Sequence, residues 1–512
     1  MLSRLILGLV ALCAMSSASA LEYVPDGTFN AGTHYLETFS GPPERHYLGQ
    51  RIVRLPDGSV IVGALVPRQE FGAYAVGLVR YDAAGVRQPW TNPGVFGAAA
   101  NRFLIFDPPG SPLRKVQGVH DLVVWGDRLF VLVNVQMGDA DVPLLPPPMI
   151  SVGHVVEILV FGTDGAFLGS TVVMPPNSPK LYSAGGIALY VPDLTAPSPA
   201  LHLVYAGTTH GTGTDRRADF VRYEVGSGAR LTRLVRRQPN PVRLCDGDRG
   251  CDIREIALGG RSSPAEPPRI YLAGSHNFGS GARDHLVMRV DVNGAPVAGF
   301  GSGGAVRIDY PASSFDDDRG QALAVTHRGS SLNQDAIYVA GEITGQCSSR
   351  AGLAKIRADG TLDPAFGASG TGTVTWSIPG AAPEHTPCGP WIGGLRLRDT
   401  SGIVASDGKI ALVSQAEYAT PPGGTEFKTE ALLTVFDAAT GAREANSLVP
   451  YRENGVRVRH SGTGALVADG AGRYTMTGHV RYFASAAPNL VGRHHVATVR
   501  LVVESSFAEV MD

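Results

Sequence analysis

The stretch I-V-R-L-P-D-G-S-V-I-V-G-A-L, residues 52–65, predicts a β-hairpin. Aliphatic and β-branched residues favour strands on both sides of a turn. Asp57-Gly58, like Asp407-Gly408 in a later segment, supplies residue types that accept the positive φ angles of a tight hairpin turn. Six more segments show the same arrangement, at residues 122–133, 186–207, 255–274, 322–341, 402–415 and 465–478.

A third apolar strand follows each hairpin at a regular interval. Its seven copies lie around Arg80, Val160, Arg222, Arg289, Lys355, Val435 and Arg500. Six intervals separate residue 80 from residue 500, so the repeat is about 70 residues long. A fourth strand such as G-T-V-T-W-S, residues 372–377, completes the unit.

Seven units of four short antiparallel strands predict an all-β fold, a single seven-bladed β-propeller over residues 21–512. The composition agrees, because 64 glycines and 36 prolines suit many turns and 44 % hydrophobic residues suffice for a core. A parallel β-solenoid is the alternative repeat architecture, but its coils would lack antiparallel hairpins.

The two ends of the chain complement each other. The last repeat supplies a hairpin and a third strand, residues 495–503, but no fourth strand. The N-terminal stretch 25–39 reads as the missing turn and strand, so we expect residues 35–39 to join the last blade and close the ring.

Three stretches resemble the delta-60 repeat, a family of mostly bacterial, exported propellers. R-A-D-G-T-L-D-P-A-F-G-A-S-G-T-G-T-V, residues 357–374, carries the fullest copy, and residues 290–306 and 25–32 carry degraded ones. The motif suggests that Phe366 and Phe300 wedge between adjacent blades. The resemblance implies the fold and export, and it brings no catalytic residues.

The N-terminus reads as a secretory signal peptide. Residues 1–20 contain Arg4, an apolar run of about ten residues and the small residues Ala18, Ser19 and Ala20, which predict cleavage after residue 20. We therefore expect export to the periplasm or the extracellular medium. No other stretch is long and apolar enough to span a bilayer.

The charge balance argues against nucleic acid as a partner. Without the signal segment, 43 basic residues face 46 acidic ones, because only Arg4 is removed from the 44 basic residues of the whole chain. A small molecule, a glycan or a protein is the expected partner, and a monomer is the expected state.

Long loops should lie on one face of the propeller, where strand two meets strand three and where one blade meets the next. They occupy residues 101–115, 136–154, 209–219, 238–252, 378–391 and 418–428. Long loops on a rigid scaffold commonly carry function, so we expect ligands on this face.

Four cysteines belong to the same face. Three pairings are possible; we predict Cys245 with Cys251 and Cys347 with Cys388, because an exported protein meets an oxidising environment. A zinc site is the alternative, although the spacing contains no CxxC.

Two acidic clusters are candidate Ca²⁺ sites, since carboxylate oxygens are the ligands that Ca²⁺ prefers. The first contains Asp246, Asp248 and Asp252, and the second Asp316, Asp317 and Asp318. Solvated acidic turns are the simpler explanation of both clusters.

Several other polar and aromatic residues could bind a ligand. The ends of second strands carry His210, His276, Glu342 and His479, which could ring a pocket, and Trp391 and Tyr418 could stack on a sugar. Exposed histidines and aromatic side chains packed under loops are the simpler interpretation.

No GxSxG, HExxH or phosphate-loop motif is present. The sequence therefore favours a non-catalytic binding or scaffold protein. The alternative is a propeller hydrolase or lyase acting on a lactone or glycan, with a metal ion in the axial channel.

Overall fold

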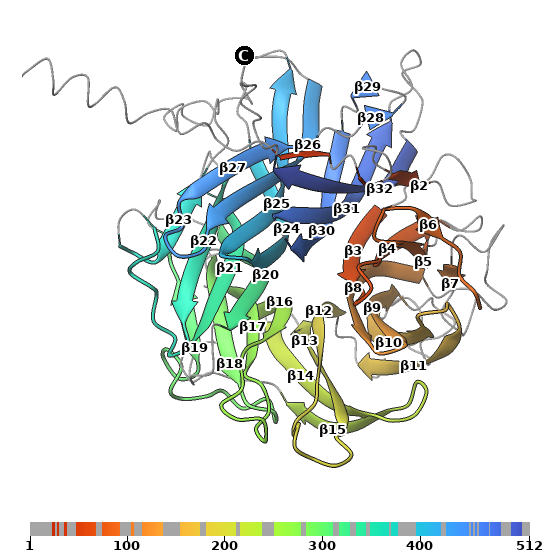
Figure 1. Cartoon of the computed structure of the whole chain (residues 1–512). Coiled ribbons are helices and arrows are strands. Elements are labelled where there is room, and N and C mark those ends of the chain that lie inside the picture. Colours follow the sequence, from red (N-terminus) through yellow and green to blue (C-terminus); the bar gives the residue numbers. More distant parts are fainter. Residues whose placement is uncertain are drawn as a thin grey trace, which may run out of the picture.

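The computed structural model describes residues 23–25, 28–29, 35–37, 48–67, 74–92, 104–106, 115–136, 154–174, 181–210, 216–237, 250–277, 283–310, 317–327, 334–344, 349–367, 370–376, 396–420, 426–449, 452–453, 456–457, 460–470, 472–482 and 493–503. Every regular element in these ranges is a β-strand. The strands form seven antiparallel blades around one axis (Figure 1), which confirms the predicted seven-bladed propeller.

The first four blades follow one another in the order of the chain. Blade 1 contains β3 (Leu48–Arg54), β4 (Val60–Pro67) and β5 (Tyr74–Tyr81), with β6 (Arg87–Gln88) and β7 (Leu104–Phe106) at its rim. Blade 2 contains β8 (Lys115–Trp125), β9 (Arg128–Gln136), β10 (His154–Gly162) and β11 (Phe167–Met174). Blade 3 contains β12 (Leu181–Tyr190), β13 (Leu201–His210), β14 (Arg216–Val225) and β15 (Leu231–Arg237). Blade 4 contains β16 (Cys251–Leu258), β17 (Ile270–Asn277), β18 (Arg283–Val290) and β19 (Ala305–Ile308).

The remaining blades repeat this order. Blade 5 contains β20 (Asp317–His327), β21 (Asp335–Thr344), β22 (Ser349–Arg357) and β23 (Thr373–Trp376). Blade 6 contains β24 (Arg396–Ser406), β25 (Lys409–Thr420), β26 (Glu426–Asp437) and β27 (Arg443–Leu448). A small hairpin of β28 (Arg452–Glu453) and β29 (Val456–Arg457) precedes blade 7, which contains β30 (His460–Gly470), β31 (Arg473–Tyr482) and β32 (Arg493–Val503). The first strand of each blade lies nearest the axis (Figure 1).

The N-terminal segment completes blade 7, as predicted. Both β1 (Tyr23–Pro25) and β2 (Tyr35–Glu37) pair antiparallel with β32, and Tyr35 lies opposite Thr498. Arg500 of β32 secures this closure, because its guanidinium donates to Thr28 Oγ1 (2.9 Å) and lies 4.7 Å from the centre of the Phe29 ring. The ends of the described chain are therefore joined by strand pairing and by a buried cation.

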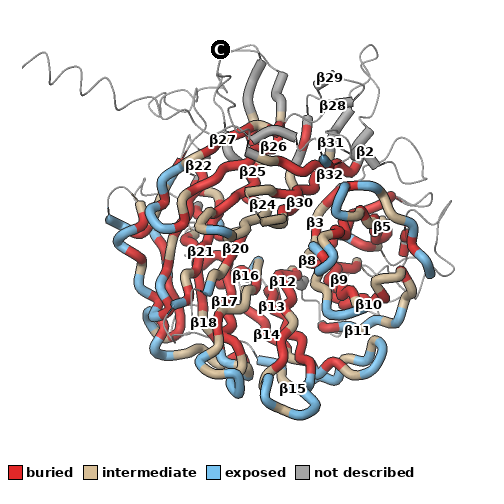
Figure 2. Tube along the Cα trace, viewed as in Figure 1, coloured by how far each residue is buried: buried red, intermediate tan, exposed pale blue. Residues whose placement is uncertain are grey.

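The hydrophobic core lies between the blades. The described residues form seven clusters of buried apolar side chains, and each cluster draws its members from two adjacent blades. Figure 2 shows the buried segments running along the blades, with exposed segments concentrated at the rim. Because apolar faces are used against neighbouring blades, the axis is left to polar side chains.

A buried phenylalanine wedges between blades, as the motif suggested. Phe366 is fully buried in the cluster between blades 5 and 6. Gly441 of blade 6 lies against it with φ of 73°, and an added Cβ would approach the ring to 3.0 Å. Next to the ring, the N–H of Gly367 donates to the carbonyl of Thr440 (2.8 Å). Phe300 occupies the equivalent place between blades 4 and 5.

The basic residue of the third strand also connects adjacent blades. Its guanidinium donates to a turn carbonyl of the next blade: Arg80 to Thr163 (3.4 Å), Arg289 to Ala358 (3.5 Å) and Arg500 to Ala83 (2.7 Å). In these three blades the arginine of the third strand therefore marks a contact with the next blade.

The two predicted Asp-Gly turns differ. Asp407 and Gly408 both have positive φ, 51° and 77°, as expected for a tight hairpin. In the other turn only Gly58 does, with φ of 83°. Asp57 instead accepts a hydrogen bond from the N–H of Ser59 (2.9 Å), so the expectation for Asp57 itself was wrong.

Replacing Phe366 with alanine should remove the wedge. We expect Phe366→Ala to lower the free energy of unfolding by about 3–5 kcal/mol, because a buried ring is lost and a cavity remains. Urea denaturation would show a lower midpoint. Leu194→Ala is the control, since Leu194 is 54 % exposed and should change stability by less than about 0.5 kcal/mol. Equal midpoints for the two variants would contradict the wedge.

Candidate functional site

Each inner strand carries a β-bulge at an equivalent place. Register with the second strand shifts between Gly49 and Arg51, Val119 and Asp121, Ala184 and Gly186, Ile253 and Glu255, Gly320 and Ala322, and Thr463 and Ala465, and across residues 398–402 of β24. A bulge inserts a residue and redirects side chains locally. It therefore places polar residues of separate blades around the axis.

Hydrogen bonds between blades hold the bulges in position. The N–H of Val119 donates to Oε1 of Gln50 in the preceding blade (2.6 Å). In the same way, the N–H of Thr400 donates to Oε1 of Gln321 (2.7 Å). These side-chain amides connect neighbouring inner strands and leave the site little freedom to rearrange.

A cavity of about 450 Å³ lies at the axis between the bulges. This axial cavity is within the size range of small-molecule sites, about 300–1,000 Å³. Its lining combines guanidinium groups, hydroxyl groups and amides: Gln50, Arg51, Val119, His120, Ala184, Asp252, Arg254, Ser275, Arg283, Arg319, Gly320, Gln321, Thr400, Ser401, Thr463 and Gly464. Among these residues, four arginines face a single carboxylate.

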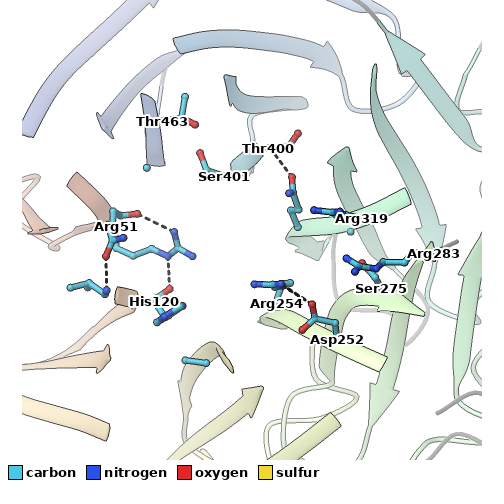
Figure 3. A pocket seen from close by; sticks show the side chains of 16 residues that line it. Arg51, His120, Asp252, Arg254, Ser275, Arg283, Arg319, Thr400, Ser401 and Thr463 are labelled. Carbon is cyan, nitrogen blue, oxygen red and sulfur yellow. Dashed lines mark hydrogen bonds and ion pairs between the residues drawn. The ribbon is translucent and has the colours of Figure 1, made fainter. Parts of the chain in front are cut away.

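Arg51 and Arg254 point into the axial cavity from opposite walls (Figure 3). Arg51 donates to the carbonyl oxygens of His120 and of Gln50, the latter at 3.0 Å. These acceptors are neutral, so they orient the guanidinium without cancelling its charge.

Asp252 holds Arg254 in place. Its Oδ2 lies 2.7 Å from Nη2 of Arg254 and 3.4 Å from Nη1 of Arg216. Burial opposes ionisation of Asp252, but Arg254 and Arg216 outweigh this effect and hold its pKa below the ordinary value. One carboxylate therefore compensates part of the positive charge around the cavity.

His120 is neutral near physiological pH. Burial lowers its pKa to about 3, and the charges of Arg51 and Arg254 contribute in the same direction. The imidazole therefore offers hydrogen bonds to a ligand without adding charge.

Two carboxyl groups converge on β12 beside the axial cavity. Oδ2 of Asp121 accepts the N–H of Ile187 (2.8 Å). Glu255 comes from the other side, and a Cβ added to Gly186 would lie 2.8 Å from its Oε1. The missing side chain at Gly186 thus leaves room for Glu255.

Burial raises the pKa of both carboxyl groups, which we call the carboxyl pair. The nearby charge of Asp121 further raises the pKa of Glu255, whereas Arg51 lowers the pKa of each. The carboxyl pair therefore retains a proton at a pH at which ordinary carboxyl groups are ionised.

The sequence did not single out Arg51, Arg254, Asp121 or Glu255. Alignment of the seven hairpins on their bulges would have found three of them, Arg51, Asp121 and Glu255. The residue after the bulge is Arg51, Asp121, Gly186, Glu255, Ala322, Gly402 and Ala465 in blades 1 to 7. Charged residues occupy three of these places and small residues four. This departure from the repeat is the sequence feature that would have indicated the site.

The predicted ligand-binding residues lie elsewhere in the blades. His210, His276, Glu342 and His479 belong to the second strands β13, β17, β21 and β31, and none of them lines the axial cavity in the described structure. His276 is buried, and His210 Nε2 lies 2.8 Å from Ser183 Oγ. Trp391 lies outside the described residues, and Tyr418 belongs to β25. Their role in binding stays a prediction.

The structure describes part of the predicted Ca²⁺ clusters. Asp246, Asp248 and Asp316 lie outside the described residues, and Asp317 begins β20. Asp318 joins Asp284 and Asp309, with carboxylate oxygens within 4.8 Å of one another, and Arg307 Nε lies 2.8 Å from Asp284. Asp252 is engaged with arginines, as described above. Ca²⁺ binding stays a prediction.

The predicted disulfides are also only partly described. Cys251 is buried at the start of β16, whereas Cys245, Cys347 and Cys388 lie outside the described residues. The two pairings therefore stay predictions.

The axial cavity lies toward the predicted functional face. The bulges are near the starts of the inner strands, and the loops that reach these starts come from the fourth strand of the preceding blade. Most residues of the long loops themselves lie outside the described ranges. No helix in the described ranges is long and apolar enough to cross a membrane.

Comparison with known proteins agrees on the fold. Residues 336–366 match a family model described as a domain of unknown function (DUF5122) β-propeller. This segment overlaps the fullest copy of the predicted motif, but the match does not confirm the delta-60 name. Comparison with curated protein sequences gives no match.

Solved structures with distant similarity include several carbohydrate-active propellers. A Trypanosoma rangeli sialidase in complex with sialic acid is 10 % identical, with a TM-score of 0.32; the match covers 93 % of this chain and 58 % of the sialidase. An α-L-arabinofuranosidase from Fusarium graminearum is 10 % identical, with a TM-score of 0.41 and coverage of 77 % and 96 %. A Penicillium chrysogenum α-L-arabinanase is 13 % identical, with a TM-score of 0.36 and coverage of 77 % and 95 %. Likeness at this level carries no information about activity.

The carboxyl pair predicts a pH dependence of stability. Because the pKa of Glu255 is higher in the folded than in the unfolded protein, its contribution is fully present at pH values below 4.5 and is lost as the pH rises through the folded value. In urea denaturation from pH 5 to 9, we expect Glu255→Gln to become progressively more stable relative to the wild type, by about 1.4 kcal/mol per unit of pKa increase.

Glu266→Gln is the matched control, because Glu266 is exposed. It should follow the wild type at every pH. A constant difference between Glu255→Gln and the wild type across this range would contradict the raised pKa.

Proposed function

We propose that this chain is an exported propeller that binds an acidic sugar, or a similar hydroxylated carboxylate, in the axial cavity. The observation that carries the proposal is the grouping of four guanidinium groups around one cavity with a single carboxylate in its wall. Arginine presents donors in a planar fork that matches a carboxylate.

The other lining groups support a hydroxylated ligand. Ser275, Thr400, Ser401 and Thr463 bring hydroxyl groups, and Gln321 brings an amide. Such groups exchange hydrogen bonds with sugar hydroxyls in both directions, since a hydroxyl donates and accepts. A neutral His120 adds another polar contact.

Binding of glucuronate tests this proposal. Calorimetric titration should detect glucuronate binding to the wild type, with much weaker binding of glucose, which lacks the carboxylate. We expect Arg254→Gln to weaken glucuronate binding by about 10–100-fold, because a hydrogen bond to a charged group is worth about 1.5–3 kcal/mol.

Arg233→Gln is the control for charge alone, because Arg233 is exposed on the outer strand β15. It should bind glucuronate like the wild type. Equal affinity of the wild type and Arg254→Gln would contradict binding in the axial cavity.

A hydrolase or lyase acting on a glycan is the second candidate function. The carboxyl pair favours it, since glycoside hydrolysis commonly uses two carboxyl groups, one of them protonated. The test is release of reducing ends from an acidic polysaccharide by the wild type. Loss of this activity in Glu255→Gln would support catalysis, and no release by the wild type would leave binding as the function.

A further inference from the structure

Arg51 serves two sites at once. Its guanidinium lines the axial cavity, and its charge acts on both members of the carboxyl pair. Its hydrogen bonds to the carbonyls of His120 and Gln50 keep it between the two sites. A change of charge in the cavity therefore alters the electrostatic potential at the carboxyl pair.

Geometry brings the carboxyl pair close together. Asp121 in blade 2 and Glu255 in blade 4 reach inward over β12 of blade 3, one bonded at Ile187 and the other beside Gly186. Leu122 also donates its N–H to Oδ1 of Asp121 (2.8 Å), so this carboxyl group is fixed. Two like charges at such a place repel each other, and a proton relieves the repulsion.

The surrounding strands offer few other groups that could exchange a proton. The charged and titratable groups that face the carboxyl pair and the cavity come from five strands: Arg51 from β3, His120 from β8, Asp252 and Arg254 from β16, Arg283 from β18 and Arg319 from β20. Strand β12 contributes only the uncharged residues Ala184, Gly185 and Gly186 here. Arginines stay charged, and Asp252 is held ionised. His120 stays neutral above its lowered pKa of about 3. His210 and His154 lie near this region. Burial lowers the pKa of each, so both imidazoles are neutral above pH 6.5, the ordinary pKa of histidine.

We propose that the axial cavity binds its carboxylate ligand together with a proton, and that Asp121 and Glu255 take up this proton. The inference rests on the proposed function. A bound carboxylate neutralises the charge of Arg51, which otherwise favours the ionised carboxyl pair. The pair then holds protons more strongly. By reciprocity, the ligand binds more tightly when the pair is protonated.

Titration of glucuronate from pH 6 to pH 9 tests the inference. The ligand is ionised throughout this range, because carboxyl groups have pKa values of about 3–4. Calorimetry in two buffers with different ionisation enthalpies should show net proton uptake on binding. The affinity should fall by about tenfold between pH 6 and pH 9, the change expected for a shift of one pKa unit.

Two variants assign the proton. In Glu255→Gln and in Asp121→Asn, proton uptake should decrease and the affinity should depend less steeply on pH than in the wild type, because each variant removes one of the two groups that take up the proton. Glu266→Gln should keep the uptake of the wild type. Wild-type binding without proton uptake, or uptake unchanged in both variants, would overturn this inference and leave the proposed function standing. Absence of glucuronate binding at every pH would overturn the proposed function itself, and the inference with it.

Discussion

Apolar packing between neighbouring blades is the interaction on which the rest of the structure depends. Each cluster of buried side chains belongs to two blades, so no blade can bury its faces without its neighbours. Ring closure by β1 and β2 follows from this need, because an unclosed last blade would expose both an apolar face and a strand edge. Since the apolar surface is used between blades, polar residues remain for the axis.

The bulges place the polar residues that form the site around the axis. A repeated fold gives seven equivalent positions around the axis. If only the fold determined the residues there, all seven positions would carry similar residues. Charged residues instead occupy neighbouring places, with Arg51 and Asp121 in successive blades and Glu255 two blades further on. Gly186 gives Glu255 its room, next to Ile187, whose N–H donates to Asp121. The departure from the repeat, and not the repeat itself, marks where function should be sought.

The fold could be predicted from the sequence because its causes are local. Hairpin turns, strand alternation and the spacing of basic residues such as Arg289 recur within each repeat, and the N-terminal strand complements the last one. The site could not be predicted in the same way. Arg51 lies in blade 1 and Glu255 in blade 4, and only the register of bulges around the ring reveals that they occupy equivalent places around the axis. Emphasis on the long loops therefore directed attention to one face of the propeller and not to these residues.

The most direct test of the account is a crystal structure of the protein with glucuronate. We predict that the ligand carboxylate lies in the axial cavity within hydrogen-bonding distance of the guanidinium groups of Arg51 and Arg254, with sugar hydroxyls toward Thr400 and Ser401. An empty axial cavity at saturating glucuronate, or glucuronate bound only at the rim of the blades, would contradict the account.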